Sequence, residues 1–429
     1  MVLPQSWCSV PLESVCLVIQ GQSPPGDTYN TERQGLPFFQ GKAEFGEIYP
    51  IPRKWCSAPV RVAEMDDVLI SIRAPVGPTN LCGTQSCIGR GLAALRPLGP
   101  VDSRYLLYAL RHTAPALAEK STGSTFDAIS GSALRAHRVP LAPAAEQRRI
   151  VAEIERQFTR LDVAVAALCR AKANLKRYRA SVLSTACTGA LVPSSGEWLS
   201  STVGEVASVG TGATPKRGSE RYWNNGHVPW VTSAVVNEPF VDEPTEFVTE
   251  LAVRETNLTV YGPGTLLLAM YGEGKTRGMV SELRILATTN QALAAVMVGK
   301  DSPVHSSYLK IALMARYAET RRLSWGGVQP NLNLGLVRSI SIHHPKDLAE
   351  QLRIVGEVES RLSVLTRLAQ VVDANLKRAE RLRQSILKRA FEGRLVPQDP
   401  ADEPASVLLG RLPQNKPETA GNRRRARGQ

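Results

Sequence analysis

Basic side chains near glycine-bearing turns are the residues of this sequence best suited to bind a ligand. In the first third of the chain they are Arg73, which begins Arg-Ala-Pro-Val-Gly77, and Arg90, which follows Gly89. Further on we select four cations and two aromatic residues: Lys216, Arg217, Lys275, Arg277, Tyr271 and Trp223. Glycine lets another backbone approach closely, and arginine can bind guanine through two hydrogen bonds. For any one of them the alternative is a solvated surface cation.

The charge balance favours a polyanionic partner. Lys plus Arg number 52 against 39 for Asp plus Glu, a formal charge of +13, and nucleic-acid binding begins with phosphate neutralisation. A soluble basic protein is the alternative. Seven cysteines without a short disulfide framework predict reduced thiols. Neither a signal peptide nor an apolar run long enough to span a membrane is evident, so we expect a cytoplasmic protein without membrane contact.

The sequence offers three weak candidates for catalysis or metal binding. Tyr271-Gly-Glu-Gly-Lys-Thr276 resembles the end of a P-loop, but that motif needs glycine at position 269, which is Ala269. His343 and His344 lack a ligand pattern around them, and Cys82 with Cys87 lacks a second cysteine pair. We therefore predict neither a catalytic site nor a metal site.

A long internal repeat determines which elements position these residues. Residues 146–193 and 350–397 align without a gap at an offset of 204, with 17 of 48 positions identical. Both copies open on Glu-Gln-x-Arg-Ile-Val and close on Gly-x-Leu-Val-Pro. Apolar residues recur mostly at steps of three and four, which predicts two helices that each bury a seam. For helix-pair packing we select Ile150, Ile154, Leu161, Leu168, Ile354, Val358, Leu365 and Val372.

The ends of the repeat predict where the helices start and stop. Pro143 and Pro345 lie just upstream of acidic first turns, and Gly189 and Gly393 suit left-handed caps. Each helix should therefore run about 40 residues, or roughly 60 Å. The link from the first helix to the next segment is about seven residues and reaches at most roughly 25 Å. An antiparallel helix pair is the economical solution.

A second, weaker repeat precedes each helix. Trp7, Gly21 and Pro24 correspond to Trp198, Gly212 and Pro215 at an offset of 191. Strand-like runs at 67–72 and 264–270 alternate with short helices expected at 103–111 and 306–318. We predict an α+β protein in which a long antiparallel two-helix coiled coil separates two mixed α/β domains, with pseudo-twofold internal symmetry. The expected boundaries are 1–145, 146–192, 193–349, 350–397 and a disordered basic tail at 398–429.

The doubled Glu-Gln-x-Arg-Ile-Val starts, each closing in Gly-x-Leu-Val-Pro and each preceded by a variable unit, resemble the specificity subunit of type I restriction–modification systems. The resemblance covers nearly the whole chain to about Pro397. It implies that residues 1–145 and 193–349 are target recognition domains that each read one half of a split double-stranded DNA target. The units diverge internally, so the target should not be a palindrome. With readers held roughly 60 Å apart, it should span no more than about 18 base pairs.

The resemblance also implies that the chain is not itself an enzyme and binds no cofactor directly. Two modification subunits, which use S-adenosylmethionine, would dock along the helices, and a restriction subunit with ATP and Mg could join them. The complex would then act as a DNA adenine methyltransferase and an ATP-dependent endonuclease. Two alternatives stay open: a stand-alone DNA-binding regulator, and a coiled-coil adaptor whose basic charge is incidental.

Overall fold

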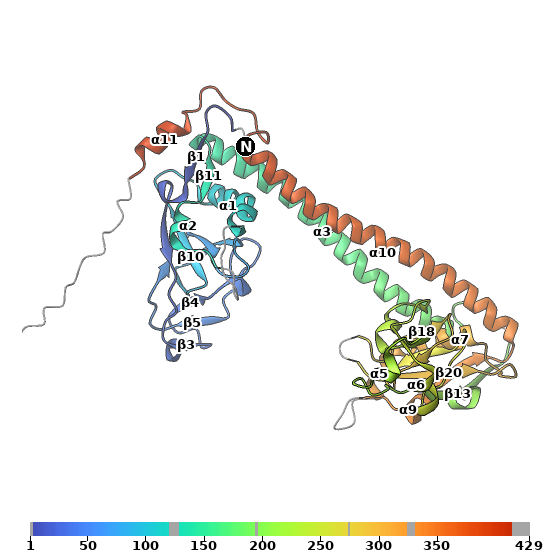
Figure 1. The fold of residues 1–429 in the computed structure, drawn as a ribbon. Coiled ribbons are helices and arrows are strands. Elements are labelled where there is room, and N and C mark those ends of the chain that lie inside the picture. The colour runs from blue at the N-terminus through green and yellow to red at the C-terminus, as the bar shows by residue number, and fades with distance from the viewer. Residues whose placement is uncertain (1–2, 120–127, 194–195, 273–274, 324–330, 414–429) are drawn as a thin grey trace, which may run out of the picture. The chain divides into compact units, whose positions relative to one another are not determined.

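The computed structural model describes residues 3–119, 128–193, 196–272, 275–323 and 331–413. The chain forms two compact units: unit 1 is Met1–Ala167 with Asn375–Gln429, and unit 2 is Leu168–Ala374. Their boundaries fall within two long helices, α3 (Ala144–Ala186) and α10 (Leu348–Phe391). Each unit therefore contains a part of both helices (Figure 1).

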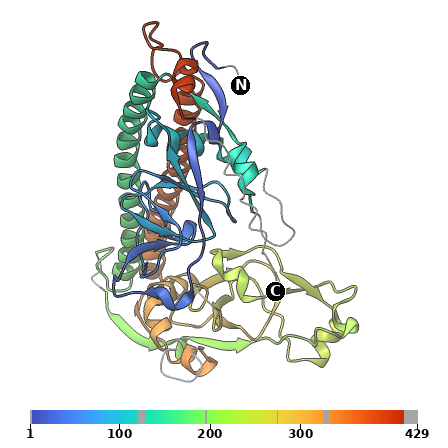
Figure 2. The same ribbon diagram turned by 90° about the vertical axis from the view of Figure 1, so that its left-hand side faces the viewer.

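Unit 1 contains three sheets. The first pairs β1 (Cys8–Pro11) with β11 (Arg138–Leu141), and Figure 2 shows β1 as a blue strand near the N-terminus. The second has the order β2 (Cys16–Gln20), β10 (Leu92–Pro97), β7 (Val68–Ser71) and β8 (Thr79–Leu81). The third has the order β3 (Tyr29–Asn30), β5 (Lys54–Cys56), β4 (Leu36–Phe39), β9 (Ser86–Ile88) and β6 (Val62–Ala63). Two further helices are α1 (Ser103–Ala118) and α2 (Gly131–Arg135).

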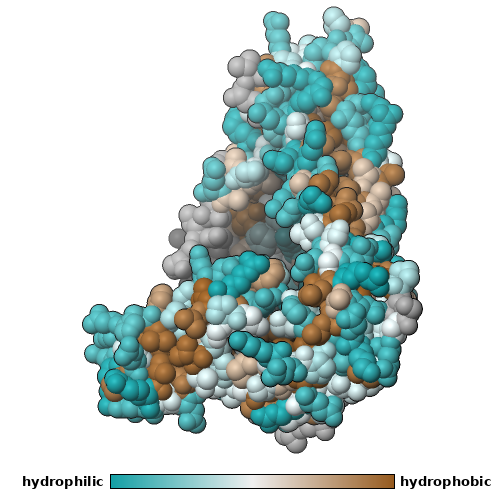
Figure 3. All heavy atoms as spheres, turned by 90° about the vertical axis from the view of Figure 1, so that its right-hand side faces the viewer, coloured by the Kyte–Doolittle hydropathy of each residue, from teal (hydrophilic) through white to brown (hydrophobic). Residues whose placement is uncertain are grey.

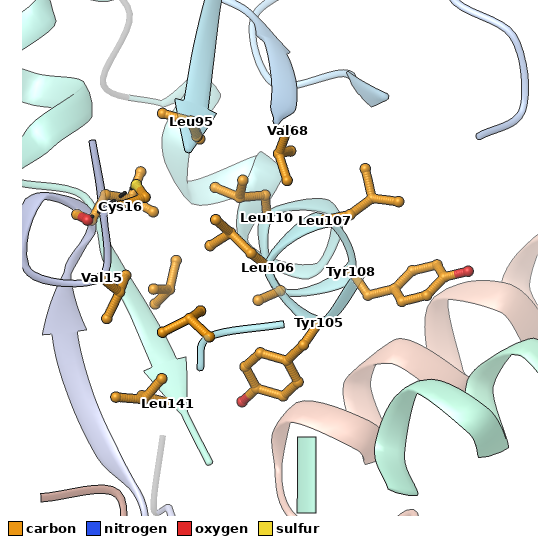
Figure 4. Packing of buried hydrophobic residues seen from close by; sticks show 14 of the residues in the cluster. Val15, Cys16, Val68, Leu95, Tyr105, Leu106, Leu107, Tyr108, Leu110 and Leu141 are labelled. Atoms are coloured by element: carbon orange, nitrogen blue, oxygen red, sulfur yellow. Dashed lines mark hydrogen bonds between the residues drawn. The ribbon is translucent and has the colours of Figure 1, made fainter. Parts of the chain in front are cut away.

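The core of unit 1 forms around α1. The side chain of Asp102 accepts a hydrogen bond from the amide of Tyr105 at 2.9 Å and so caps this helix. Its apolar residues point into a cluster with Val68 and Leu95 of the four-stranded sheet (Figure 4). Burial of a side chain the size of leucine stabilises the fold by about 1.5–3 kcal/mol. Tyr105 also donates a hydrogen bond from its hydroxyl to the carbonyl of Pro140, which ties the helix to β11.

Unit 2 repeats this plan. It pairs β12 (Trp198–Thr202) with β21 (Ser341–Pro345). A five-stranded sheet has the order β13 (Ala207–Thr211), β20 (Leu293–Val298), β17 (Leu266–Ala269), β18 (Val280–Leu283) and β15 (Phe240–Val241). A three-stranded sheet has the order β16 (Glu246–Val248), β14 (Val228–Val231) and β19 (Thr288–Thr289). Its short helices are α4 (Val203–Val206), α5 (Glu220–Trp223), α6 (Glu250–Glu255), α7 (Ser306–Ala315), α8 (Tyr317–Leu323) and α9 (Leu334–Arg338).

The two units share strand order as well as sequence anchors. The order β2-β10-β7-β8 in unit 1 matches β13-β20-β17-β18 in unit 2, which adds β15 at the edge. The predicted strands within 67–72 and 264–270 form as β7 and β17, and the helices predicted at 103–111 and 306–318 form as α1, α7 and the start of α8. The predicted α+β class with an internal repeat is confirmed.

The repeated Glu-Gln-x-Arg start of each long helix has a structural explanation. Gln147 is fully buried, accepts a hydrogen bond from the amide of Asp102 at 3.0 Å and donates to the carbonyl of Ala142 at 2.8 Å. Gln351, at the offset of 204, makes the same bonds to the amide of His305 and the carbonyl of Pro345, both at 2.8 Å. Each glutamine thus joins its long helix to the N-cap of a domain helix and to the C-terminal end of the preceding strand or the residue after it.

The long helices also end alike. Gly189 and Gly393 have φ of +74° and +69°, the left-handed conformation that glycine adopts without strain. The amide of Ala190 bonds to the carbonyl of Thr185 at 3.2 Å, and the amide of Arg394 bonds to that of Arg389 at 2.8 Å. This bond, reaching back five residues, is characteristic of a Schellman cap. The predicted glycine caps are confirmed.

The helices are antiparallel within each unit. In unit 1 the start of α3 and the end of α10 share one hydrophobic cluster, as Ile154 and Phe391 illustrate. In unit 2 the end of α3 and the start of α10 share another, as Leu183 and Val358 illustrate. Ion pairs link the same two helices in both units: Arg383 with Asp162 in unit 1, and Lys172 with Asp373 at 2.6 Å in unit 2.

The residues selected for helix-pair packing divide into two groups. Ile150, Ile154, Ile354 and Val358 are almost fully buried and lie in the cores of the globular units as well as against the partner helix. Leu365 and Val372 are buried in unit 2, whereas Leu161 and Leu168 are only partly buried. The predicted seam of helix-pair contacts is therefore not uniform, because the start of each long helix also packs in the core of a globular unit.

The expected disorder of residues 398–429 is wrong for the part that the structure describes. Helix α11 (Ala405–Arg411) packs into the core of unit 1, where Ala405, Leu408 and Leu412 are buried. Asp402 pairs with Arg149 at 2.5 Å. The composition of this stretch did not predict the helix, because only three buried apolar residues in a polar, proline-rich segment bind it to the core. Residues 414–429 lie outside the described part of the chain.

Candidate DNA interface

The glycine turn that follows β2 places Arg90 at the surface of unit 1. The amide of Gly21 bonds to the carbonyl of Leu92 at 2.9 Å, and the amide of Arg90 donates to the hydroxyl of Ser23 at 3.4 Å. A side chain at position 21 would overlap the carbonyl of Gly89, so glycine is required there. The Arg90 side chain remains exposed.

Arg73 lies next to Arg90 along this edge. Ile72 donates its amide hydrogen to the carbonyl of Gly91 at 3.0 Å, which joins the segment after β7 to the turn before β10. Arg73 and Arg90 adjoin the two ends of that bond, and both side chains are exposed. The structure therefore brings together the two cations selected in the first unit.

Unit 2 builds the same edge with different side chains. Met270 donates its amide hydrogen to the carbonyl of Ala292 at 2.8 Å, the counterpart of the bond between Ile72 and Gly91. This bond places Tyr271 at the position of Arg73 and Gln291 at the position of Arg90. Tyr271 is 37% exposed, and Gln291 is exposed.

Gln291 is a candidate that the search for cations missed. The hydroxyl of Thr214, in the repeated Gly-x-[Ser/Thr]-Pro turn, donates to the side-chain oxygen of Gln291 at 2.6 Å. In unit 1 the matching turn residue, Ser23, accepts a hydrogen bond from Arg90. The repeated Gly-x-[Ser/Thr]-Pro turn could have identified Gln291 from the sequence, because in both units this turn forms a hydrogen bond with the residue at this position.

Arg217 and Trp223 belong to a structural cluster. The Arg217 guanidinium lies over Trp223 and Trp230, 4.1 Å and 4.9 Å from the ring centroids, and pairs with Glu246 at 2.5 Å. This guanidinium lowers the pKa of Glu246. The indole of Trp223 donates to the carbonyl of Lys216 at 3.2 Å, while the Lys216 side chain is exposed. Of these residues, Lys216 has the side chain best placed to contact a phosphate.

The second group of selected cations divides in the structure. Lys275 is exposed, and its carbonyl accepts a hydrogen bond from the hydroxyl of Tyr317 at 2.6 Å. Arg277 is only 8% exposed. We therefore remove Arg277 from the candidate interface, because a buried guanidinium cannot reach a base edge in this conformation. Glu273 and Gly274 of the P-loop-like stretch lie outside the described residues.

The histidines that suggested a metal site have other roles. His344 is fully buried and bonds to the hydroxyl of Ser201 at 3.1 Å, and His343 bonds to Ser200 at 2.8 Å. Cys82 and Cys87 are buried free thiols. Within the described ranges, no group of three or more potential metal-binding side chains comes together. Within the same ranges, no helix has the length and apolar character to cross a membrane.

Comparison with known proteins finds similarity to one family. Residues 195–368 match the family model described as "Type I restriction modification DNA specificity domain". A putative type I restriction enzyme MjaX specificity subunit from Methanocaldococcus jannaschii is 40% identical over 156 residues, 36% of this chain and 37% of that relative. The EcoR124I/EcoR124II specificity subunit of Escherichia coli is 26% identical over 171 residues, 40% of this chain and 41% of the relative. These two matches thus span less than half of each relative.

Longer matches extend along the chain. The EcoBI specificity subunit of Escherichia coli is 20% identical over 97% of this chain and 94% of its own. A solved chain from work on complex assembly and conformational transition of the type I R-M system superposes with a TM-score of 0.73 at 20% identity, covering 92% of this chain and all of that one. The HsdS subunit of Thermoanaerobacter tengcongensis gives 0.52 at 20% identity, with 92% and 98% covered. At this identity the two structures support the fold alone.

The fold defines an internally duplicated α+β protein with two paired long helices and two related strand edges. Residues 195–368 match the DNA specificity domain of type I restriction–modification systems, and the chain is similar to specificity subunits of these systems, as its doubled helix starts predicted.

Proposed function

We propose that this protein is the non-catalytic subunit that recognises DNA and holds the enzymes of a type I restriction–modification complex. One observation carries the proposal: the same strand edge is built twice with different exposed side chains. Arg73 and Arg90 are exposed on unit 1, and Tyr271 and Gln291 on unit 2. Arginine suits guanine and glutamine suits adenine, so the two edges would read different base sequences. The target would be bipartite, non-palindromic double-stranded DNA.

The long helices supply the proposed spacing between the half-sites. They contain 43 and 44 residues, or about 65 Å each at 1.5 Å per residue. At about 3.4 Å per base pair this length corresponds to roughly 19 base pairs. Unread spacer DNA would therefore separate two short half-sites.

An exposed apolar groove supports the proposal of protein partners on the helices. In unit 2 a groove of about 600 Å³ lies between α3 and α10, lined by Tyr178, Val364 and Leu368 among others. These three side chains are 48%, 45% and 47% exposed, and Figure 3 shows exposed apolar side chains in a strip along the helical region. Exposed apolar patches of this kind mark protein interfaces. The groove favours a scaffold over a regulator that acts alone.

The proposed partners are two modification subunits, which carry S-adenosylmethionine, and a restriction subunit that uses ATP and Mg. This chain would bind and orient them on cytoplasmic DNA without holding a cofactor itself.

Mapping methylated adenines in host genomes with and without this gene tests the proposal. We expect a bipartite motif that disappears with the gene. Exchange of residues 198–345 for those of a related subunit should then change one half-site and leave the other intact. A genome map that does not change on deletion would overturn the proposed function.

A further inference from the structure

A cleft in unit 2 has no role in the proposed DNA interface. It encloses about 680 Å³ between α7, α10 and the loop before β15. Its lining includes Arg179, Glu238, Phe240, Ser307, Met314 and Glu359. Both acids and cations line it, so charge alone does not identify what it binds.

The corresponding positions in unit 1 can be assigned from shared bonds. Tyr105 and Tyr308 each donate a hydrogen bond to the strand before the long helix, at Pro140 and His343. This pair aligns α1 with α7 at an offset of 203. The loop before β15 aligns similarly, because the amide of Leu81 bonds to the carbonyl of Ile48 and the amide of Glu282 bonds to that of Pro239.

In unit 1, two arginines bind at the matching positions. Arg104 pairs with Glu155 and donates to the hydroxyl of Tyr49 at 3.1 Å. Arg111 donates to the backbone carbonyls of Glu47 at 2.6 Å and Thr79 at 3.2 Å. Both guanidinium groups therefore bind acceptors that belong to unit 1 itself.

Unit 2 keeps the two glutamates and lacks the arginines at the matching positions. Ser307 stands at the position of Arg104, and Met314 at that of Arg111. Glu359 and Glu238 correspond to Glu155 and Glu47. Among the described residues, the structure records no ion pair to Glu359 within 4.0 Å. A shorter side chain at 307 thus leaves both space and an available carboxylate.

The nearby cation Lys310 is already engaged. Its ammonium group pairs with Glu282 at 3.1 Å and lies 3.7 Å from the centroid of the Phe240 ring. Burial lowers the pKa of Lys310, and the carboxylate of Glu282 opposes that shift. Lys310 is therefore committed to Glu282 in this arrangement.

We propose that this cleft binds an arginine side chain supplied by a partner protein, in the place that Arg104 occupies in unit 1. The partner is the modification subunit, so the inference rests on the proposed function and specifies part of its docking surface. The inserted guanidinium would bind the Glu359 carboxylate, and its stem would pack against the apolar wall formed by Ile311, Met314 and Leu362. A charge-assisted bond of this kind is roughly twice as strong as a neutral one.

Two substitutions test the cleft, with the purified modification subunit as the probe. Glu359→Gln should weaken its binding to the full-length chain by about tenfold or more, because the variant loses the charged partner of the inserted guanidinium. Ser307→Arg should weaken binding at least as much, because the chain then supplies its own guanidinium to Glu359. Arg104 occupies the same helix position in unit 1, so the variant should fold. Calorimetric titration measures both affinities, and circular dichroism verifies folding.

Glu155→Gln is the matched control, because its carboxylate is already bound to Arg104. We expect partner affinity within twofold of the parent. Hydrogen exchange should slow at residues 236–240 and 306–310 of the parent when the partner binds, but not in Ser307→Arg. If the parent binds the modification subunit and both cleft variants bind equally well, the cleft inference is overturned while the proposed function stands. If the parent does not bind the subunit, the proposed function fails first.

Discussion

Gln351 accepts a hydrogen bond through its side-chain oxygen from the backbone amide of His305 at 2.8 Å. Gln147 makes the corresponding bond to Asp102 at 3.0 Å. His305 and Asp102 are the N-cap residues of α7 and α1. The repeated glutamine therefore forms a structural joint between each long helix and its globular domain.

Removing this joint should destabilise unit 2. In Gln351→Ala the amide of His305 and the carbonyls of Pro303 and Pro345 lose their side-chain partner, and Gln351 itself is fully buried. We expect a loss of about 2–4 kcal/mol, since leaving a buried polar group unpaired costs about 1–3 kcal/mol. Urea unfolding followed by circular dichroism measures the change. Gln384→Ala, on the exposed surface of α10, should change stability by less than about 0.5 kcal/mol; equal losses would refute the joint.

Removal of α11 should destabilise unit 1. Truncation after Pro397 exposes the cluster around Leu408 and Leu412 and deletes the partner of Arg149. We expect a loss of about 3–5 kcal/mol, mainly from two buried leucines at about 1.5–3 kcal/mol each. Truncation after Pro413 retains the docked helix and should leave unfolding unchanged. If the two truncations unfold alike, α11 contributes no stability.

Periodicity and capping residues were enough to predict the long helices, because their signals are local. Steps of three and four predicted two helices, and Gly189 and Gly393 predicted where each helix ends. The residues of the candidate DNA interface were harder to predict from the sequence, because tertiary structure decides whether a cation is exposed. Arg217 is next to Lys216 in the sequence, and Arg277 is close to Lys275. Both lysines are exposed, whereas Arg217 lies over two indole rings and Arg277 is buried. Gln291 carries no charge and becomes a candidate only through its hydrogen bond with Thr214.

Exchanging the two edge residues should exchange base preference at one position of each half-site. Arg90→Gln should shift one position of the first half-site from guanine toward adenine, and Gln291→Arg should shift one position of the second the other way. Each change should alter discrimination by about 1–3 kcal/mol. Selection from a randomised DNA pool, followed by sequencing, reads both half-sites at once. Lys216→Ala should weaken binding to all sequences alike and reduce its salt dependence.

Cysteine reactivity should single out one thiol. Burial raises the pKa of Cys16 to about 12 and those of Cys82, Cys87 and Cys187 to about 11, whereas Cys169 is exposed on α3. At pH 8 these four thiols are almost wholly protonated because their pKa values are raised, and the thiolate is the reactive form. Labelling of the folded protein with a maleimide, read by mass spectrometry, should show Cys169 as the fastest site, which Cys169→Ser removes, whereas the partly buried Cys8 should react more slowly. Rapid labelling of several cysteines in that variant would contradict the packing described here.

Lengthening both helices in register tests the proposed spacing role. Two ion pairs, Arg383 with Asp162 and Lys172 with Asp373, give the register of the helix pair. In both pairs the two residue numbers add up to 545, so residues that face one another follow this rule. Insertions of four residues after Ala167 and after Lys377 therefore fall opposite one another. Four residues add about 6 Å, or roughly two base pairs of unread spacer, and leave both half-sites unchanged. Methylation mapping gives the spacer length directly, and insertion in α3 alone should impair binding because it breaks the pairing. An unchanged spacer in the double insertion, with binding retained, would show that the helices do not set the distance.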